Sequence, residues 1–325
     1  MKHNATRRKT VLVTGANGYI GNAVANAFNR AGWKTYGLCR READAAGLAR
    51  NEIHPLIGSP EELSFLKQTE EAVFDVVVSN TEDFTAMASH LSKVKQMMAA
   101  IGEHGAKAGI RPLLMFTSGC KDYGGMDLKD GDAGLAPHTE SSPMKAPDLL
   151  LPREQFGSAL LVAEGAPYDA TVLRPTIVYG LSSSHYGPLF DLASGSEGVL
   201  ELLADPAAIM HSLHVDDCAE AYVMLAEHPQ RREVAQQAFN ISSQHYETAQ
   251  QIGEALAHSY GLQLKLSAPI GTVPIETVHG LANFWQWVGS DKLRALTGWH
   301  ERRATFTTGL EEYRLAYETR SRHQA

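Results

Sequence analysis

Strand-like and helix-like patterns of apolar residues alternate along the first half of the chain. Short runs rich in apolar and β-branched residues predict strands, and intervening segments with helical spacing predict helices. The expected strands are 11–14, 34–39, 53–57, 74–80, 112–117 and 170–175, and the expected helices are 22–31, 42–50, 61–71, 81–108 and 152–163. Such alternation is typical of an α/β protein with a doubly wound parallel sheet and right-handed crossovers.

A glycine-rich turn joins the first predicted strand to the first predicted helix. Its glycines are Gly15, Gly18 and Gly21. In a strand–turn–helix unit the first glycine permits a tight turn, the second lets the backbone approach a pyrophosphate, and the third allows close packing. The phosphates then lie at a helix N-terminus, where free N–H groups favour negative charge. The pattern predicts a Rossmann-type dinucleotide site that also includes Asn17, Tyr19 and Ile20.

The alternation breaks down after the fifth strand. Residues 118–152 are rich in Gly, Asp, Pro and Ser without a clear period, and long loops in compact domains are usually functional or disordered. We expect a dinucleotide-binding domain over 1–180, with a return segment at about 213–242. Residues 181–212 and 243–325 are expected to form a smaller C-terminal substrate lobe.

Composition and charge exclude several classes of protein. The 325-residue chain is 44% hydrophobic and carries a formal net charge of −8, which argues against a nucleic-acid partner. No apolar run approaches the roughly 18 residues of a membrane span, and the basic start lacks the apolar region of a signal peptide. Three widely spaced cysteines do not suggest a disulfide framework. We therefore expect a cytoplasmic protein, either a monomer or a homodimer, that acts on a small molecule.

Five stretches together resemble the extended short-chain dehydrogenase/reductase superfamily, the NAD(P)-dependent epimerase/dehydratase group. They are 14–21 (TGANGYIG), 117–124 (TSGCKDYG), 174–180 (RPTIVYG), 214–219 (HVDDCA) and 239–242 (FNIS). The resemblance covers roughly residues 10–260. It implies a Rossmann domain, a C-terminal substrate lobe, and NAD(P) bound across the C-terminal edge of the sheet.

One departure from that family pattern concerns its catalytic pair. The family usually carries Tyr-x-x-x-Lys on the helix after the long loop, where the tyrosine moves a proton and the lysine lowers its pKa. The corresponding segment, 145–156 (KAPDLLLPREQF), contains no tyrosine and no lysine four residues after one. The chain is therefore expected to be an atypical member.

The second strand ends with Arg40 and Arg41. NAD-preferring members of the family tend to carry an acidic residue here, whereas an arginine fork suits the 2′-phosphate of NADP. This predicts NADP, with NAD the less favoured cofactor; the alternative is a pair of solvated surface arginines.

Other cofactor contacts are expected at the ends of later strands. Ser79, Asn80 and Thr117 end buried strands at the edge where ligands collect in this fold, although Ser and Asn also serve as turn formers. The resemblance further implies that Pro175, Ile177 and Val178 run under the nicotinamide.

Ser118, Lys121 and Tyr123 are the candidates for proton chemistry. A lysine beside a tyrosine can depress the tyrosine pKa from about 10. The alternative is that Tyr123 packs in the core and Lys121 points to solvent.

Three functions remain open, and no metal site is expected. His211 and His214 lie three residues apart but lack an evident third ligand. The first function is an NADP-dependent oxidoreductase that acts on a carbonyl or an activated alkene. The second is a non-redox epimerase, dehydratase or isomerase of the same fold. The third is a regulatory protein that senses NADP(H) without turnover.

Overall fold

The computed structural model describes residues 7–69, 73–182, 185–269, 271, 273–275 and 277–321. The chain forms two compact units. The first comprises residues 1–118, 148–173 and 219–238, and the second comprises 119–147, 174–218 and 239–325. Residues 119–147, expected in the dinucleotide-binding domain, cluster instead with the second unit.

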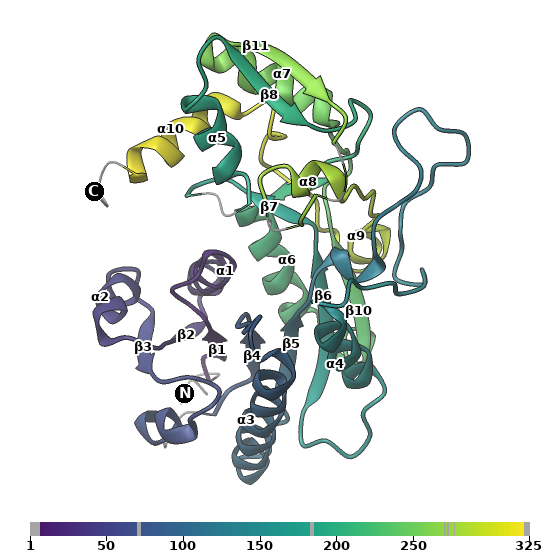
Figure 1. Ribbon diagram of the computed structural model, residues 1–325. Helices are drawn as coiled ribbons and strands as arrows, with labels where there is room; N and C mark the ends of the chain where they lie inside the picture. Colours follow the sequence, from purple (N-terminus) through teal and green to yellow (C-terminus); the bar gives the residue numbers. More distant parts are fainter. Residues whose placement is uncertain are drawn as a thin grey trace. The chain divides into compact units, whose positions relative to one another are not determined.

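A seven-stranded sheet confirms the predicted α/β class (Figure 1). Its strands are β1 (Thr10–Thr14), β2 (Lys34–Cys39), β3 (His54–Ile57), β4 (Val76–Ser79), β5 (Leu113–Thr117), β6 (Asp169–Pro175) and β10 (Gln237–Ile241). They run in the order β10-β6-β5-β4-β1-β2-β3, and the pairings from β3 to β6 are parallel. The chain moves outward from β1 in both directions, so the switch point lies between β1 and β4, where this fold binds ligands.

The sheet is covered on both faces. Residues 11–13, 76–78 and 113–115 are fully buried, as expected for continuous apolar runs in a parallel sheet. The accompanying helices are α1 (Tyr19–Arg30), α2 (Glu42–Arg50), α3 (Met87–Lys107), α4 (Leu151–Leu161) and α6 (Val215–Glu227). Helices α3 and α4 contact each other.

The prediction of an α-helix over residues 61–71 is wrong. Residues Leu63–Thr69 form a 3₁₀ helix, η1, and the next three residues lie outside the described part of the chain. The Gln68 side chain bonds both the N–H and the carbonyl of Ile57, at 3.3 and 2.9 Å. The segment is thus tied to the end of β3.

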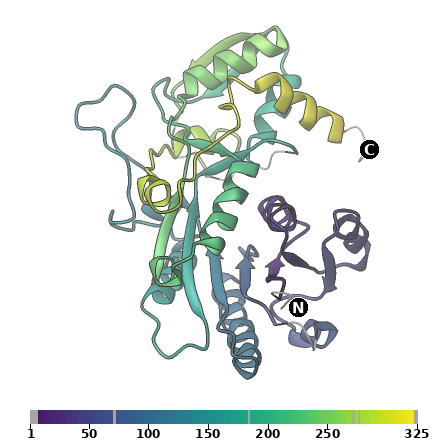
Figure 2. The same ribbon diagram turned by 180° about the vertical axis from the view of Figure 1, so that it is seen from behind.

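The second unit contains two small parallel sheets and short helices. Strand β7 (Ile177–Tyr179) pairs with β9 (Ser212–His214), and β8 (Val199–Leu203) pairs with β11 (Gln263–Ser267). Its helices are α5 (Gly187–Ser194), α7 (Ala249–Tyr260), α8 (Gly280–Asn283), α9 (Asp291–Thr297) and α10 (Leu310–Ser321), with a 3₁₀ turn η2 (Cys120–Tyr123). A further 3₁₀ turn, η3 (Arg231–Glu233), belongs to the first unit. Helix α7 lies along the β8–β11 sheet (Figures 1 and 2).

Aromatic side chains form much of the core of the second unit. Tyr179, Tyr186, Phe190, Phe306 and Tyr313 are all buried, and their rings contact one another at centroid distances between 4.5 and 6.4 Å. Such contacts favour edge-to-face geometry and add to the stabilisation from burial. Tyr186, at the start of α5, is therefore a core residue.

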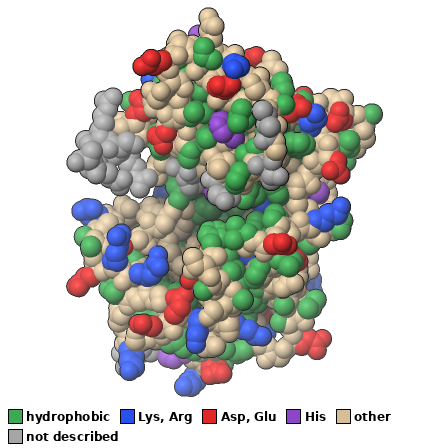
Figure 3. Space-filling model, in the orientation of Figure 1, with side chains coloured by type: hydrophobic (Ala, Val, Ile, Leu, Met, Phe, Trp, Pro, Cys, Tyr) green, Lys and Arg blue, Asp and Glu red, His purple; other side chains and the backbone are tan. Residues whose placement is uncertain are grey.

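The surface is mixed in charge. On the face drawn in Figure 3, Lys and Arg side chains are interspersed with Asp and Glu. Within the part of the chain that the structure describes, no helix combines the length and apolarity needed to cross a bilayer.

Candidate functional site

The glycine turn in the first unit has a backbone that requires glycine. Gly15 adopts φ +62°, a left-handed conformation that favours glycine, and a Cβ there would lie 3.1 Å from the Asn80 carbonyl. The Gly18 N–H donates to the Gly15 carbonyl at 2.8 Å, and α1 begins at the next residue without a side-chain cap. The turn therefore leads directly into a helix N-terminus.

The third glycine fixes how closely the helix approaches this turn. A Cβ on Gly21 would lie 2.2 Å from the carbonyl oxygen of Gly15, a distance that real Cβ atoms do not show. Only glycine lets the first turn of α1 rest on the backbone of the glycine turn.

A polar cluster lies beside this turn at the edge of the sheet. The Asn80 N–H donates to Thr14 Oγ1 at 3.1 Å, and Thr117 Oγ1 donates to Asn80 Oδ1. Thr117 also contacts the hydroxyl of Tyr222, on α6, at 2.9 Å. Ser79 Oγ and Asn80 Nδ2 are buried and have no partner among the described residues. Buried polar atoms without partners are costly, so they fit the polar groups of a dinucleotide.

The two arginines after β2 differ in their surroundings. Arg40 is exposed, and within the described residues its side chain makes no hydrogen bond. Arg41 instead bonds the carboxylate of Asp44 through Nε and Nη2, at 2.9 and 2.8 Å. Of these two arginines, Arg40 is the one whose guanidinium is available for a phosphate.

Tyr123 is held as a structural residue of the second unit. Its ring is fully buried and stacks on His138 at a centroid distance of 5.2 Å. Its hydroxyl donates to Asn240 Oδ1 at 2.7 Å and accepts from Arg174 Nη1 at 3.0 Å. The expectation that Lys121 depresses the Tyr123 pKa is wrong, because burial raises that pKa well above its ordinary value. These contacts fit a packing role better than proton transfer.

Lys121 faces a narrow pocket in the same unit. Its ammonium lies 5.3 Å from the centre of the Phe284 ring. The pocket holds about 20 Å³ of space for a water-sized sphere, and Pro175 and Ile177 also line it. Val178 is buried in β7. Two of the three residues expected under the nicotinamide thus border a space that a lysine reaches.

Ser118 lies directly after β5, in the first unit. It is 6% exposed, and its N–H donates to the Leu173 carbonyl at 2.8 Å. The neighbouring Cys120 is buried, with Sγ 2.9 Å from the Arg174 carbonyl, and burial raises its pKa. This thiol is structural.

Helix α4 follows β5 and the long loop, where the family carries its catalytic pair. Its sequence, LPREQFGSALL, contains neither tyrosine nor lysine. Its buried charge is Arg153, 7% exposed, which pairs with Glu82 at 2.8 Å. The sequence analysis did not single out Arg153 and Tyr222, which also belong to this unit. Both are polar side chains at positions where the helical pattern predicts burial, and that mismatch could have identified them.

Residues in and next to the histidine–aspartate segment 214–219 form buried hydrogen bonds with the C-terminal part of the second unit. His211 bonds Ser243 at 3.1 Å and accepts from the Val288 N–H, so its ring is fully engaged. Asp217 accepts the N–H groups of Arg302 and Arg303, at 3.1 and 3.0 Å.

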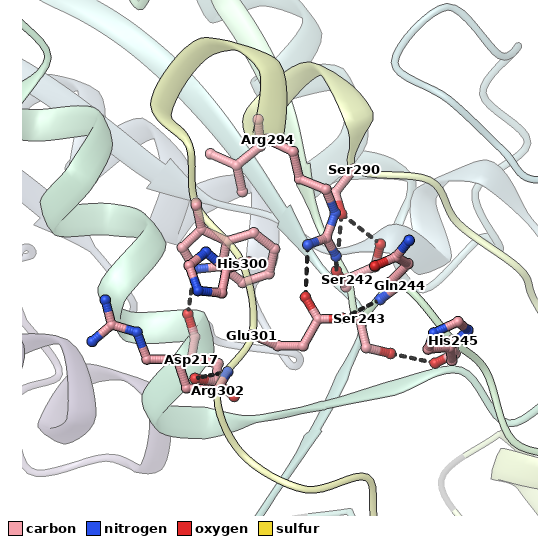
Figure 4. Close-up of polar contacts among 12 residues, drawn as sticks. Asp217, Ser242, Ser243, Gln244, His245, Ser290, Arg294, His300, Glu301 and Arg302 are labelled. Atoms are coloured by element: carbon pink, nitrogen blue, oxygen red, sulfur yellow. Dashed lines mark hydrogen bonds and ion pairs between the residues drawn. The ribbon is translucent and has the colours of Figure 1, made fainter.

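Figure 4 shows further polar contacts next to these hydrogen bonds. Glu301 binds the guanidinium of Arg294 at 2.6 Å, and Arg294 donates to the Ser242 carbonyl at 2.9 Å. Asp217, in the motif 214–219, therefore holds the backbone of Arg302 and Arg303 next to these contacts.

The fold and the glycine turn define the class of protein: it is a protein with a Rossmann-type fold. The family model described as the NAD dependent epimerase/dehydratase family matches residues 11–242. The chain belongs to that family.

Several known proteins are similar to the chain. An uncharacterized protein of Schizosaccharomyces pombe, C2A9.02, is 26% identical over 219 residues, which are 67% of this chain and 70% of that protein. The structure of dTDP-glucose 4,6-dehydratase from Bacillus anthracis in complex with NAD has a TM-score of 0.74 at 15% identity, covering 97% and 98% of the two chains. UDP-glucose 4-epimerase from Thermotoga maritima with UDP-glucose has a TM-score of 0.72 at 18% identity, covering 96% and 99%. At these identities the solved structures show the fold alone.

The closeness of Gly21 to Gly15 gives a stability prediction. Gly21→Ala is expected to lower the free energy of unfolding by about 1–3 kcal/mol, because the added methyl forces the helix off the turn. Gly47→Ala, within α2 and with nothing within 4 Å of its Cβ position, is the matched control. It should raise that free energy by about 0.5–1 kcal/mol. Urea unfolding measures both, and equal effects of the two changes would refute the close contact.

Two buried histidines predict a loss of stability in mild acid. Burial lowers the pKa of His211 and His214 to about 4, whereas an unfolded histidine titrates near 6.5. The unfolded chain binds more protons below about pH 6.5, so the free energy of unfolding falls as the pH drops from there toward 4. The slope is up to about 1.4 kcal/mol per pH unit for each histidine.

Urea unfolding at pH 7.5, 6.5 and 5.5 checks this. His211→Gln should flatten the slope, and His258→Gln, at an exposed position of α7, should not. A stability that is constant over this range would contradict the prediction.

Proposed function

We propose that this protein binds a nicotinamide dinucleotide on its first unit and catalyses a redox-neutral epimerisation or dehydration of a small hydroxylated substrate. The main support for the proposal is the glycine turn of Gly15, Gly18 and Gly21. It lies next to buried atoms of Ser79 and Asn80 that have no partner among the described residues. Family membership over residues 11–242 favours the redox-neutral reaction over net reduction.

The residues of the first unit fit such a cofactor. The glycine turn and the N-terminus of α1 would hold the pyrophosphate, with Asn17, Tyr19 and Ile20 in the same segment. Ser79, Asn80 and Thr117 supply polar atoms at the switch point. When bound, the nicotinamide supplies hydride acceptance and return.

Proton transfer in this protein needs a group other than the family's tyrosine. Ser118 and Lys121 are the proposed groups, because Tyr123 is locked by two hydrogen bonds. Lys121 lies beside Pro175 and Ile177. A lysine ammonium can stabilise an alkoxide or donate to a carbonyl oxygen.

An NADP-dependent oxidoreductase is the second candidate, favoured by one observation. The exposed guanidinium of Arg40 after β2 suits a 2′-phosphate, and NADP(H) is the form that net reductions commonly consume.

The ratio of product formed to cofactor consumed tests the reaction type. With UDP-glucose and dTDP-glucose as first substrates, and NMR as the readout, the product should accumulate well beyond the amount of added NAD(P)⁺ without lasting absorbance at 340 nm. In the same assay Lys121→Met should lower turnover by at least about 10²-fold. Lys265→Met, on an exposed lysine of β11, is the matched control.

Other outcomes decide between the candidates. Stoichiometric oxidation of NADPH with a carbonyl or enone panel would replace the proposal with the oxidoreductase. Tight nucleotide binding without turnover of any substrate would indicate a regulatory protein.

Cofactor preference is expected to follow Arg40. Arg40→Ala removes the partner of the 2′-phosphate, a charge-assisted contact of about 1.5–3 kcal/mol, so NADPH affinity should fall at least about tenfold. NADH affinity should stay the same. Arg50→Ala, at the exposed end of α2, is the control. Fluorescence titration measures all affinities, and equal weakening of both nucleotides would exclude the assignment.

A further inference from the structure

The two arginines after β2 do not act alone, because a carboxylate lies beside them. Asp44, in the first turn of α2, accepts both hydrogen bonds of the Arg41 fork, at 2.8 and 2.9 Å. It also accepts a hydrogen bond of 3.0 Å from Asn17 Nδ2, in the glycine turn. The Asp44 side chain therefore links three segments: the glycine turn, the end of β2 and the start of α2.

The contacts keep Asp44 ionised and in place. Its hydrogen bonds from Arg41 hold the pKa of the carboxyl below its usual range. Its position at a helix N-terminus also favours negative charge. A fixed anion thus lies within hydrogen-bond distance of a residue of the glycine turn.

This carboxylate has opposite effects on the two nicotinamide dinucleotides. Strands β1 and β2 are paired neighbours, with Thr14 opposite Leu38, so a ligand that extends from the glycine turn to the end of β2 passes Asn17 and Asp44. A ribose hydroxyl can donate to a carboxylate, whereas a 2′-phosphate is repelled by it. The same carboxylate pairs with Arg41, leaving Arg40 as the arginine of the two that has no carboxylate partner among the described residues.

We propose that Asp44 determines cofactor specificity: it withholds Arg41 from the 2′-phosphate and keeps the site open to NAD as well as NADP. The inference rests on the proposed function, since it assumes that a dinucleotide occupies this turn. It assigns Arg40 and Asp44 opposing roles at one end of the ligand. The wild-type protein is then a weak discriminator between the two cofactors.

Removing the charge of Asp44 tests this role. Asp44→Asn is expected to raise NADPH affinity by about tenfold, because Arg41 becomes free to pair with the phosphate. NADH affinity should stay constant or fall. Fluorescence titration of each nucleotide, at one fixed salt concentration, gives the ratio of affinities.

Two further variants separate specificity from general charge and from structure. Glu42→Gln removes a charge from the same helix turn, at an exposed position that forms no hydrogen bond or ion pair with Arg41, and should change the ratio less than twofold. Arg41→Ala combined with Asp44→Asn should cancel the gain for NADPH. Thermal unfolding of each variant checks that the turn remains folded.

The outcomes are distinct. Binding of both nucleotides with an unchanged ratio in Asp44→Asn, or an equal gain in Glu42→Gln, overturns the role of Asp44 and leaves the proposed function intact. Absence of binding of either nucleotide to the wild-type protein overturns both.

Discussion

The contact between the start of α1 and the backbone of the glycine turn is the constraint on which the first unit depends. At Gly21 there is no room for a Cβ, which would lie 2.2 Å from the Gly15 carbonyl. At Gly15 the backbone takes a left-handed conformation, and a Cβ would also crowd the Asn80 carbonyl. The turn is therefore fixed from two sides, by its own helix and by the loop after β4. A site built on such a turn is preorganised before a ligand arrives.

That constraint also explains why the sheet edge is polar. The backbone of Asn80 lies close to Gly15. Its N–H donates to Thr14 Oγ1, and its side-chain oxygen accepts from Thr117. A polar cluster of this kind is costly unless it is satisfied. Two of its atoms have no partner within the described residues, which is the sort of local cost that binding sites carry and cores do not.

The fold of the first unit was predictable because its signals are local. The predicted strand 34–39 and helix 42–50 match β2 and α2, since β-branched runs and helical spacing report burial directly. The glycine turn was equally readable from Gly15, Gly18 and Gly21. Strands β8 and β11 were not predicted, because each has only five residues and exposed positions alternate in them with less exposed ones. Their pairing depends on contacts between distant parts of the sequence.

The candidate site was less predictable, because charge pairing decides which polar residues are available. Arg40 and Arg41 are indistinguishable in the sequence, and only the position of Asp44 separates them. Tyr123 and Lys121 also look like a catalytic pair by spacing. The structure places the phenol between Arg174 and Asn240 and the ammonium near Phe284.

The raised pKa of Tyr123 has a consequence for any chemistry on this fold. A phenol that serves as a base in the usual family mechanism must lose its proton near neutral pH, which needs a neighbouring cation and some access to solvent. Arg174 supplies a cation 3.0 Å away, yet burial outweighs it and the pKa of Tyr123 rises. Proximity of a positive charge is therefore not enough when the phenol is fully desolvated. The fully buried phenol of Tyr123 therefore does not fit the role of the tyrosine that α4 lacks.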